Sequence, residues 1–230
     1  MHFSQSLFYC NFAFRINKYF QLQAISRTMG TWVVFCTAQI PSETLEAFQT
    51  QSTRPTSAPP TPWILQQNLS EGVHGPELSN PAPSFITGFK DVSPTTLQTF
   101  IKENLEGQYD FPNFRGNIEW DEFVVLDKRS AKDNTCLVYH RLQYMPEGSA
   151  EDEWDKEKLI YEWKVWRVKF LVAWQLVAGL SMGDDVEFSI WEDEKKAYTD
   201  ENGVLQLPYL EQDKSEYPDL EDRVPWGPGN

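Results

Sequence analysis

The motif with the most chemical content is GLSMG at residues 179–183, which fits the GxSxG pattern of a serine nucleophile. In α/β-hydrolases the two glycines allow a tight turn that exposes the serine, and a histidine later in the chain takes its proton. The three histidines here are His2, His74 and His140, and all of them precede the serine. Ser181 is therefore a candidate nucleophile for a small serine hydrolase, and the alternative is that it ends a helix at a glycine-containing turn.

His140 is the second candidate catalytic residue, because it is the histidine that lies inside the predicted folded body. It stands in a β-rich run, Thr135–Leu142. Alternate residues of a strand share a face, so His140 is predicted to point the same way as the apolar Val138 and Leu142. A histidine on such a face is either a general base or a core residue whose polar atoms are satisfied by hydrogen bonds.

No pattern for a metal or a cofactor is present. The sequence contains neither HExxH, CxxC nor a calcium loop, and it contains neither GxxxxGK[ST] nor GxGxxG. We therefore predict no metal site and no cofactor. The three cysteines leave one thiol over whichever pair forms, which indicates a reducing compartment.

The charge of the chain restricts its partners. Its 230 residues include 20 Lys and Arg against 34 Asp and Glu, a net charge of -14. Such a surface repels phosphate backbones, so we expect no nucleic-acid binding and favour a protein partner with a basic surface. No apolar run approaches the ~20 residues that a membrane-spanning helix needs, so a soluble protein is expected.

The N-terminal segment differs in composition from the rest. Residues 1–42 contain no Asp or Glu but include three basic residues. We predict that residues 1–30 form a basic leader, and two interpretations stay open. The leader is a mitochondrial presequence, which is typically basic and free of acids, or Met29 is the true start and the preceding residues are a disordered extension of a cytoplasmic protein.

The elements that would position these residues begin at Thr31–Ile40, an apolar, β-branched run that predicts a buried strand. Pro41-Ser42 then starts a short helix. Residues 50–90 are rich in Pro, Ser, Thr and Gln and predict a long insertion, in which Trp63–Leu65 is an anchor that docks on the domain or on a partner. Ser93-Pro94 supplies the N-cap and first-turn proline of an amphipathic helix.

The second half of the chain predicts more strands than helices. Glu122–Leu126 and Thr135–Leu142 flank a polar turn and predict an antiparallel hairpin. Leu159–Leu180 first alternates and then takes helical spacing, so it predicts a strand followed by a helix. Val186–Trp191 alternates again, and Asn202-Gly203 predicts a further hairpin.

Together these elements predict an α+β fold in a single domain over residues 31–207. The sheet is expected to be mixed or mainly antiparallel, with two or three helices. Residues 208–230 are acidic and rich in Pro and Gly, and they predict a tail.

The hairpin residues Phe123–Val138, the run Trp166–Val168, the segment Gly179–Phe188 and the turn Glu201–Val204 resemble an uncharacterised family of bacterial and fungal domains of unknown function. The resemblance covers roughly residues 31–207. It implies no catalytic residues, and it implies that the GLSMG stretch belongs to a structural segment.

Three functions are compatible with this pattern. We favour a non-enzymatic protein-interaction module, because no motif carries a complete catalytic set. The alternatives are a serine hydrolase that uses Ser181 and a small-ligand-binding domain whose pocket is built from some of the nine tryptophans.

Overall fold

The computed structural model describes residues 30–53, 58, 62–70, 84–105, 118–146, 158–181 and 199–206. Within this part of the chain, five strands form one sheet in the order β2-β1-β3-β4-β5. The strands are β1 (Thr31–Cys36), β2 (Trp63–Gln66), β3 (Ile118–Leu126), β4 (Thr135–Tyr144) and β5 (Ile160–Lys169). The helices are α2 (Ser42–Ser52), α3 (Pro94–Leu105), α4 (Ser130–Asp133) and α5 (Phe170–Ser181).

The sheet is mixed, as predicted. β1 runs parallel to both β2 and β3, whereas β3, β4 and β5 are successive antiparallel neighbours. The α+β class is confirmed. There is one helix more than the two or three expected, because the polar turn between β3 and β4 contains the single-turn helix α4.

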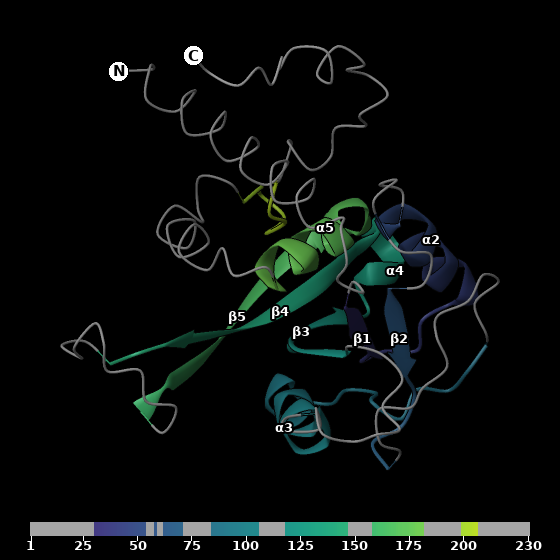
Figure 1. The fold of residues 1–230 in the computed structure, drawn as a ribbon. Helices are drawn as coiled ribbons and strands as arrows, with labels where there is room; N and C mark the ends of the chain where they lie inside the picture. Colours follow the sequence, from purple (N-terminus) through teal and green to yellow (C-terminus); the bar gives the residue numbers. More distant parts are fainter. Residues whose placement is uncertain are drawn as a thin grey trace, which may run out of the picture.

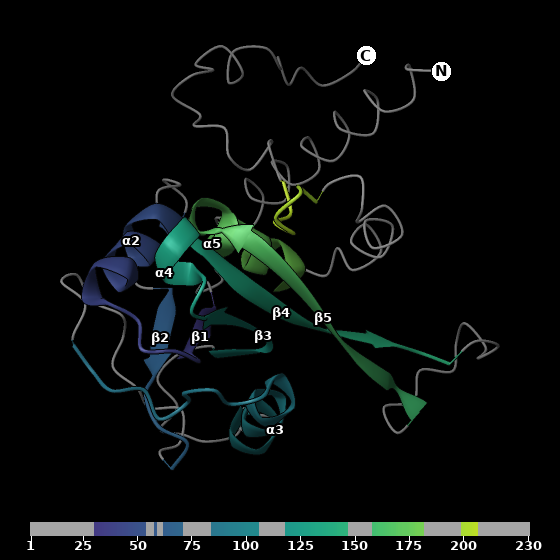
Figure 2. The same ribbon diagram turned by 180° about the vertical axis from the view of Figure 1, so that it is seen from behind.

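The helices cover both faces of the sheet. Helices α2 and α5 lie on one side and α3 lies on the other, as Figures 1 and 2 show. The first core lies under α2 and α5, where Phe48 and Phe170 meet edge to face at 5.2 Å. The second core lies under α3, where Phe35 packs against Phe100 and Phe123. Burial of both sheet faces explains why β1 is apolar at every position after Thr31.

The predicted insertion at residues 50–90 contains a strand of the sheet, which the sequence analysis did not anticipate. β2 is fully buried and pairs in parallel with β1, with Trp63 opposite Trp32. The indole of Trp63 donates a hydrogen bond to Ser52 at the end of α2. The expected anchor therefore docks on the domain itself, and four buried residues were too few to produce a recognisable period.

The predictions for the second half are largely confirmed. The hairpin of β3 and β4 is present, and β5 passes directly into α5. Thr199 and Leu205 form a single antiparallel bridge around Gly203, where a longer hairpin was expected. The predicted strand Val186–Trp191, the leader and the tail lie outside the described residues. No helix in the described ranges is long and apolar enough to cross a membrane.

Candidate anion-binding site

Ser181 and His140, the two candidates from the sequence, are joined through a third residue. Ser181 is the last residue of α5, and its hydroxyl lies 2.8 Å from Glu122 Oε2. The other carboxylate oxygen, Glu122 Oε1, lies 2.9 Å from His140 Nδ1. Trp32 Nε1 donates to Ser181 Oγ at 3.2 Å. The structure therefore links residues from β1, β3, β4 and α5 in one chain of hydrogen bonds.

This order of groups differs from a catalytic triad. In a triad the imidazole lies between the serine and the carboxylate, so that it can take the hydroxyl proton. Here the carboxylate of Glu122 lies between Ser181 and His140. Ser181 also stands at the C-terminal end of its helix, where the helix dipole is negative and would disfavour an oxyanion. The arrangement suits a structural link between α5 and the sheet better than a nucleophile.

A bulge in β3 directs Glu122 toward this link. Trp32 pairs with Glu119, but the next residue of β1, Val33, pairs with Phe123, so three residues of β3 have no partner on β1. Glu122 is 1% exposed and was not a candidate in the sequence analysis. Burial, together with the charges of Glu122 and Asp121, raises the pKa of the neighbouring Glu119 to about 7.

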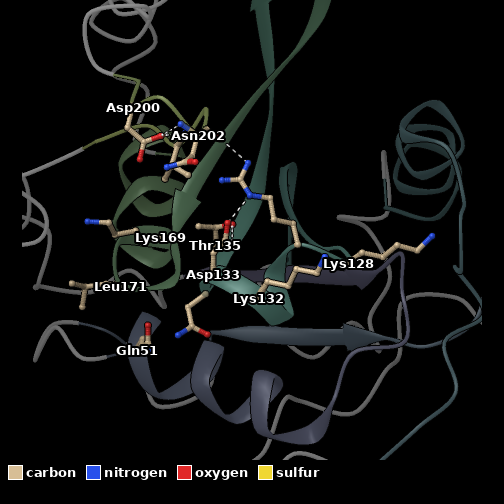
Figure 3. A pocket seen from close by; sticks show the side chains of 12 residues that line it. Gln51, Lys128, Lys132, Asp133, Thr135, Lys169, Leu171, Asp200 and Asn202 are labelled. Carbon is tan, nitrogen blue, oxygen red and sulfur yellow. Dashed lines mark hydrogen bonds and ion pairs between the residues drawn. The ribbon is translucent and has the colours of Figure 1, made fainter.

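A separate cavity of about 860 Å³ lies at the other end of α5 (Figure 3). It falls within the size range of small-ligand and peptide sites. Its walls come from the end of α2, the β3–β4 connection, the start of α5 and the bridge segment 199–206. The lining residues are Gln51, Lys128, Arg129, Lys132, Asp133, Asn134, Thr135, Lys169, Leu171, Asp200, Asn202 and Val204. None of these is aromatic, so the cavity differs from the tryptophan-lined pocket that the sequence suggested.

Positive charge dominates this cavity, which we call the cationic pocket. Four of its lining residues are cationic, namely Lys128, Arg129, Lys132 and Lys169. Two are anionic, Asp133 and Asp200, and Asp133 is ion-paired with Arg129. Lys128 is ion-paired with Asp91, which lies outside the lining, at 3.0 Å, so the lining together with this aspartate has a net charge of +1 in a chain of -14. A concave surface with this charge attracts anions, whereas the rest of the protein repels them.

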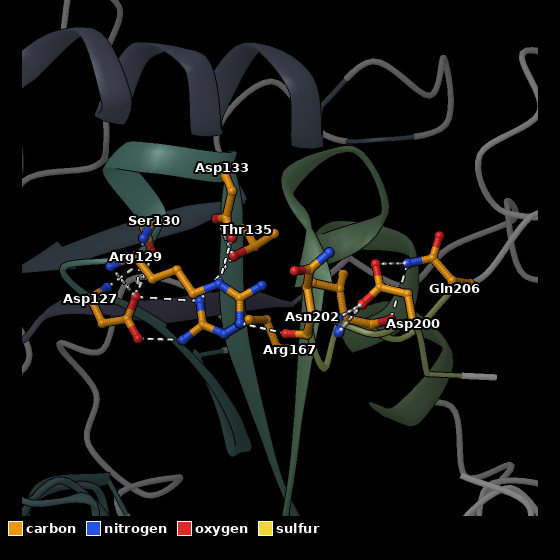
Figure 4. Close-up of polar contacts among 10 residues, drawn as sticks. Asp127, Arg129, Ser130, Asp133, Thr135, Arg167, Asp200, Asn202 and Gln206 are labelled. Carbon is orange, nitrogen blue, oxygen red and sulfur yellow. Dashed lines mark hydrogen bonds and ion pairs between the residues drawn. The ribbon is translucent and has the colours of Figure 1, made fainter. Parts of the chain in front are cut away.

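Asp127 fixes the turn that carries three of the cationic lining residues (Figure 4). Its Oδ1 accepts hydrogen bonds from the backbone amides of Arg129 and Ser130, at 3.0 and 3.1 Å, which fixes the turn that carries the cations. Arg167 on β5 donates to both of its carboxylate oxygens. Burial alone would raise the pKa of Asp127, but the Arg167 guanidinium and the two amides outweigh it and hold that pKa below its usual value.

Arg129 connects two walls of the pocket. Its Nε donates to Asp133 one helical turn away, and its Nη1 donates to the backbone oxygen of Asn202 at 2.7 Å. On the opposite wall, Asp200 Oδ1 accepts from the amides of Asn202 and Val204, both at 2.9 Å. One hydrogen bond, from Arg129, therefore joins the bridge segment to the residue before α4, and the Asp200 bonds fix the shape of the segment itself (Figure 4).

The first turn of α5 also faces the cationic pocket, since Leu171 is part of the lining. The amide of Phe170 donates to the carbonyl of Asn134, which adopts a left-handed conformation with φ of 54°. The first turn of α5 contains no acidic residue. The positive end of the helix dipole therefore adds to the positive potential of the four cations.

The sequence analysis missed this pocket. It described residues 127–134 only as a polar turn, while Lys169 and Asn202 lie far along the chain and belong to no recognisable motif. The described residues contain no group of three or more His, Cys, Asp or Glu placed to hold a metal ion.

Comparisons with known proteins add no relatives: no protein-family model matches the chain, and neither a curated protein nor a solved structure matches it. The resemblance to a family of uncharacterised domains stays a prediction.

Proposed function

We propose that the protein is a protein-interaction module that binds an acidic segment of a partner protein in the cationic pocket. The observation that carries the proposal is an open cavity of about 860 Å³ on a chain of net charge -14, lined by four cationic residues of which Lys128 and Arg129 are ion-paired with aspartates. The polar lining offers donors to carboxylates, and the pocket has little apolar surface beyond Leu171 and Val204.

The proposed ligand has the opposite charge from the partner that the composition suggested. A basic partner would be attracted by the surface as a whole, and that expectation stays a prediction. The pocket instead favours carboxylates, because a local excess of one positive charge outweighs a distant negative charge that salt screens over about 8 Å.

The test uses fluorescence anisotropy of a fluorescein-labelled hexaglutamate peptide with the full chain at low ionic strength. The double variant Lys132→Gln, Lys169→Gln is expected to lose about tenfold in affinity, since each removed contact is worth roughly 0.5–1 kcal/mol. The matched control is Lys90→Gln, Lys102→Gln, which removes two exposed lysines outside the pocket.

Equal affinity of the pocket variant and the control variant for the peptide would show that the pocket is not the binding site. Competition experiments with unlabelled ligands identify the class of ligand. If a single-stranded RNA oligonucleotide or inorganic phosphate displaced the peptide at concentrations below those of unlabelled hexaglutamate, the acidic-peptide assignment would be wrong.

A further inference from the structure

The bridge segment 199–206 contains the one Asn-Gly pair of the chain, Asn202-Gly203. In such a pair the backbone nitrogen of the glycine can reach the side-chain amide of the asparagine, because glycine has no side chain to block the approach. Both residues are exposed. A β-carbon built on Gly203 meets no atom within 4 Å, so the turn leaves room for the ring that this attack forms.

The reaction is a deamidation, and it consumes only water. The backbone nitrogen of Gly203 attacks Cγ of Asn202, a carbon–nitrogen bond forms, and the side-chain nitrogen leaves as ammonia with the amide proton of Gly203. The ring closure is intramolecular and therefore efficient. Water then opens the resulting succinimide at one of its carbonyls. Opening at Cγ gives aspartate, whereas opening at the main-chain carbonyl gives isoaspartate, in which that carbonyl becomes the new carboxylate.

Arg129 contacts the peptide group that reacts. Its Nη1 donates to the backbone oxygen of Asn202 at 2.7 Å, as Figure 4 shows. When the Gly203 amide loses its proton, negative charge spreads onto this oxygen, and a guanidinium donor at hydrogen-bond distance stabilises that charge. The ion pair with Asp133 uses a different nitrogen of Arg129, Nε, and holds the guanidinium in position. The contact therefore acts through a direct hydrogen bond and does not require a net positive pocket.

The same contact favours one of the two products. The main-chain carbonyl of the succinimide is the carbonyl that Arg129 polarises, so water attacks it in preference to the side-chain carbonyl. The carboxylate of isoaspartate then contains the oxygen that already lies beside Arg129 Nη1. A hydrogen bond between a guanidinium and a carboxylate is stronger than one to a neutral carbonyl, and it stabilises this product.

We propose that Asn202 is a deamidation site and that Arg129 is the positioning residue that speeds the reaction and directs it to isoaspartate. One contact opposes the reaction, since the Gly203 amide donates to the carbonyl of Asp200 at 2.9 Å. This hydrogen bond must open before the nitrogen attacks. A single bond in an exposed turn opens at little cost in free energy, so it slows the reaction without preventing it.

The modification changes the cationic pocket, because Asn202 is part of its wall. A carboxylate replaces a neutral amide, so the net charge of +1 for the lining with Asp91 falls to zero. The deamidated protein is therefore expected to bind labelled hexaglutamate more weakly, a consequence that rests on the proposed function. Deamidation without a change in affinity would show that the modification does not regulate the pocket.

The experiment compares two full-length variants with the unmodified protein during incubation at mildly alkaline pH. Arg129→Gln removes the contact. Lys132→Gln is the matched control, because it removes the same charge from the adjoining helix α4, and no hydrogen bond within the described ranges joins Lys132 to Asn202. Peptide mapping by mass spectrometry gives the fraction of residue 202 that is converted, and chromatography separates the isoaspartyl and aspartyl peptides.

The expected result is slower conversion in the Arg129 variant alone. Arg129→Gln should slow the reaction about fivefold, the effect of one hydrogen bond, and Lys132→Gln should stay within about twofold of the unmodified protein. The share of isoaspartate should fall only in Arg129→Gln. In urea, where the fold no longer places Arg129, the two variants should convert at the same rate.

Three outcomes would overturn the proposal. Equal rates and equal product ratios in the two folded variants would exclude Arg129 from the reaction. Faster conversion in Arg129→Gln would show that the contact protects Asn202. Conversion in urea but none in the folded protein would show that the turn blocks the attack. The mapping of residue 202 uses no ligand, so a failure of hexaglutamate to bind would end the proposed function and leave the deamidation result standing.

Discussion

Glu122 on β3 and His140 on β4 stand directly opposite one another in the sheet, with Glu122 Oε1 at 2.9 Å from His140 Nδ1. Both side chains are almost fully buried, at 1% and 4% exposure. A buried carboxylate is tolerated when its oxygens are hydrogen-bonded, and here Ser181 occupies the second oxygen. Through Ser181, the Glu122–His140 pair therefore fixes the end of α5 to the centre of the sheet.

Replacing Glu122 is expected to lower the stability of the fold. Glu122→Gln keeps the size of the side chain but removes the charge that both neighbours contact, so we expect a loss of about 2–3 kcal/mol in the free energy of unfolding. Ser181→Ala removes, at an exposed helix end, the hydroxyl that contacts Glu122 and accepts from Trp32, and it should cost about 1–2 kcal/mol. Urea denaturation measures both. A larger loss for Ser181→Ala than for Glu122→Gln would contradict the central place given to the carboxylate.

Glu119 should make stability depend on pH. Its pKa is raised from 4.5 to about 7, so the folded protein keeps the proton over a range in which the unfolded chain has lost it. The free energy of unfolding therefore falls as the pH rises from about 4.5 to about 7. Glu119→Gln mimics the protonated form and should be about 1 kcal/mol more stable than the unmodified protein at pH 8, with solvent screening allowed for, and equal to it at pH 4.

The control for Glu119 is Glu103→Gln, at an exposed position of α3. Its stability should stay within about 0.5 kcal/mol of the unmodified protein at both pH values. Urea denaturation at the two pH values is the measurement, and a Glu119→Gln effect of the same size at pH 4 and pH 8 would show that ionisation is not its cause.

Asp127 should have the opposite pH dependence. Its pKa in the folded state is lowered from 3.8, so its contribution is present above that pH and is lost as the pH falls through the folded-state pKa. Asp127→Asn should cost about 2 kcal/mol at pH 7, because charge-assisted hydrogen bonds to Arg167 and two amides weaken. The cost should shrink at pH 2. Thermal unfolding at both pH values tests this, with Glu103→Gln at an exposed position of α3 as control.

Substitutions at two glycines are expected to have opposite effects, and the first tests the candidate elbow. Gly179 lies inside α5, and a β-carbon added there meets nothing within 4 Å, so Gly179→Ala should stabilise the protein by about 0.5–1 kcal/mol. Gly203 has equal space but a φ of 74°, so Gly203→Ala should cost about 1 kcal/mol. Chemical denaturation of both variants is decisive, because a nucleophile elbow at residues 179–183 would make Gly179→Ala destabilising.

The sequence predicted the elements whose side chains repeat regularly over one face. The α3 helix was found from Ser93 and its apolar spacing, and Ser93 Oγ does accept from the Thr96 amide at 3.2 Å. The transition from β5 to α5 was visible because the period changes from two to 3.6 near Phe170. β2 was not found, because its four residues are buried on both faces and show no alternation.

The two sites depend on contacts that no local pattern records. The bulge in β3 decides that Glu122 points to the core. A bulge arises from the pairing register of two strands, which is set when the strands come together. The cationic pocket gathers Lys128, Lys132 and Lys169 only because β4 and β5 pair and α5 begins beside α4.

Local sequence thus determined most of the secondary-structure types, although not β2 or α4, together with the acidic charge and the α+β class, because propensity and periodicity act over a few neighbouring residues. Tertiary structure alone decided which charged side chains meet. The Ser181–Glu122 contact joins residues 59 positions apart, and the Arg129–Asn202 contact joins residues 73 apart. Such contacts are selected by the packing of whole elements, and therefore the two sites became visible only in the folded protein.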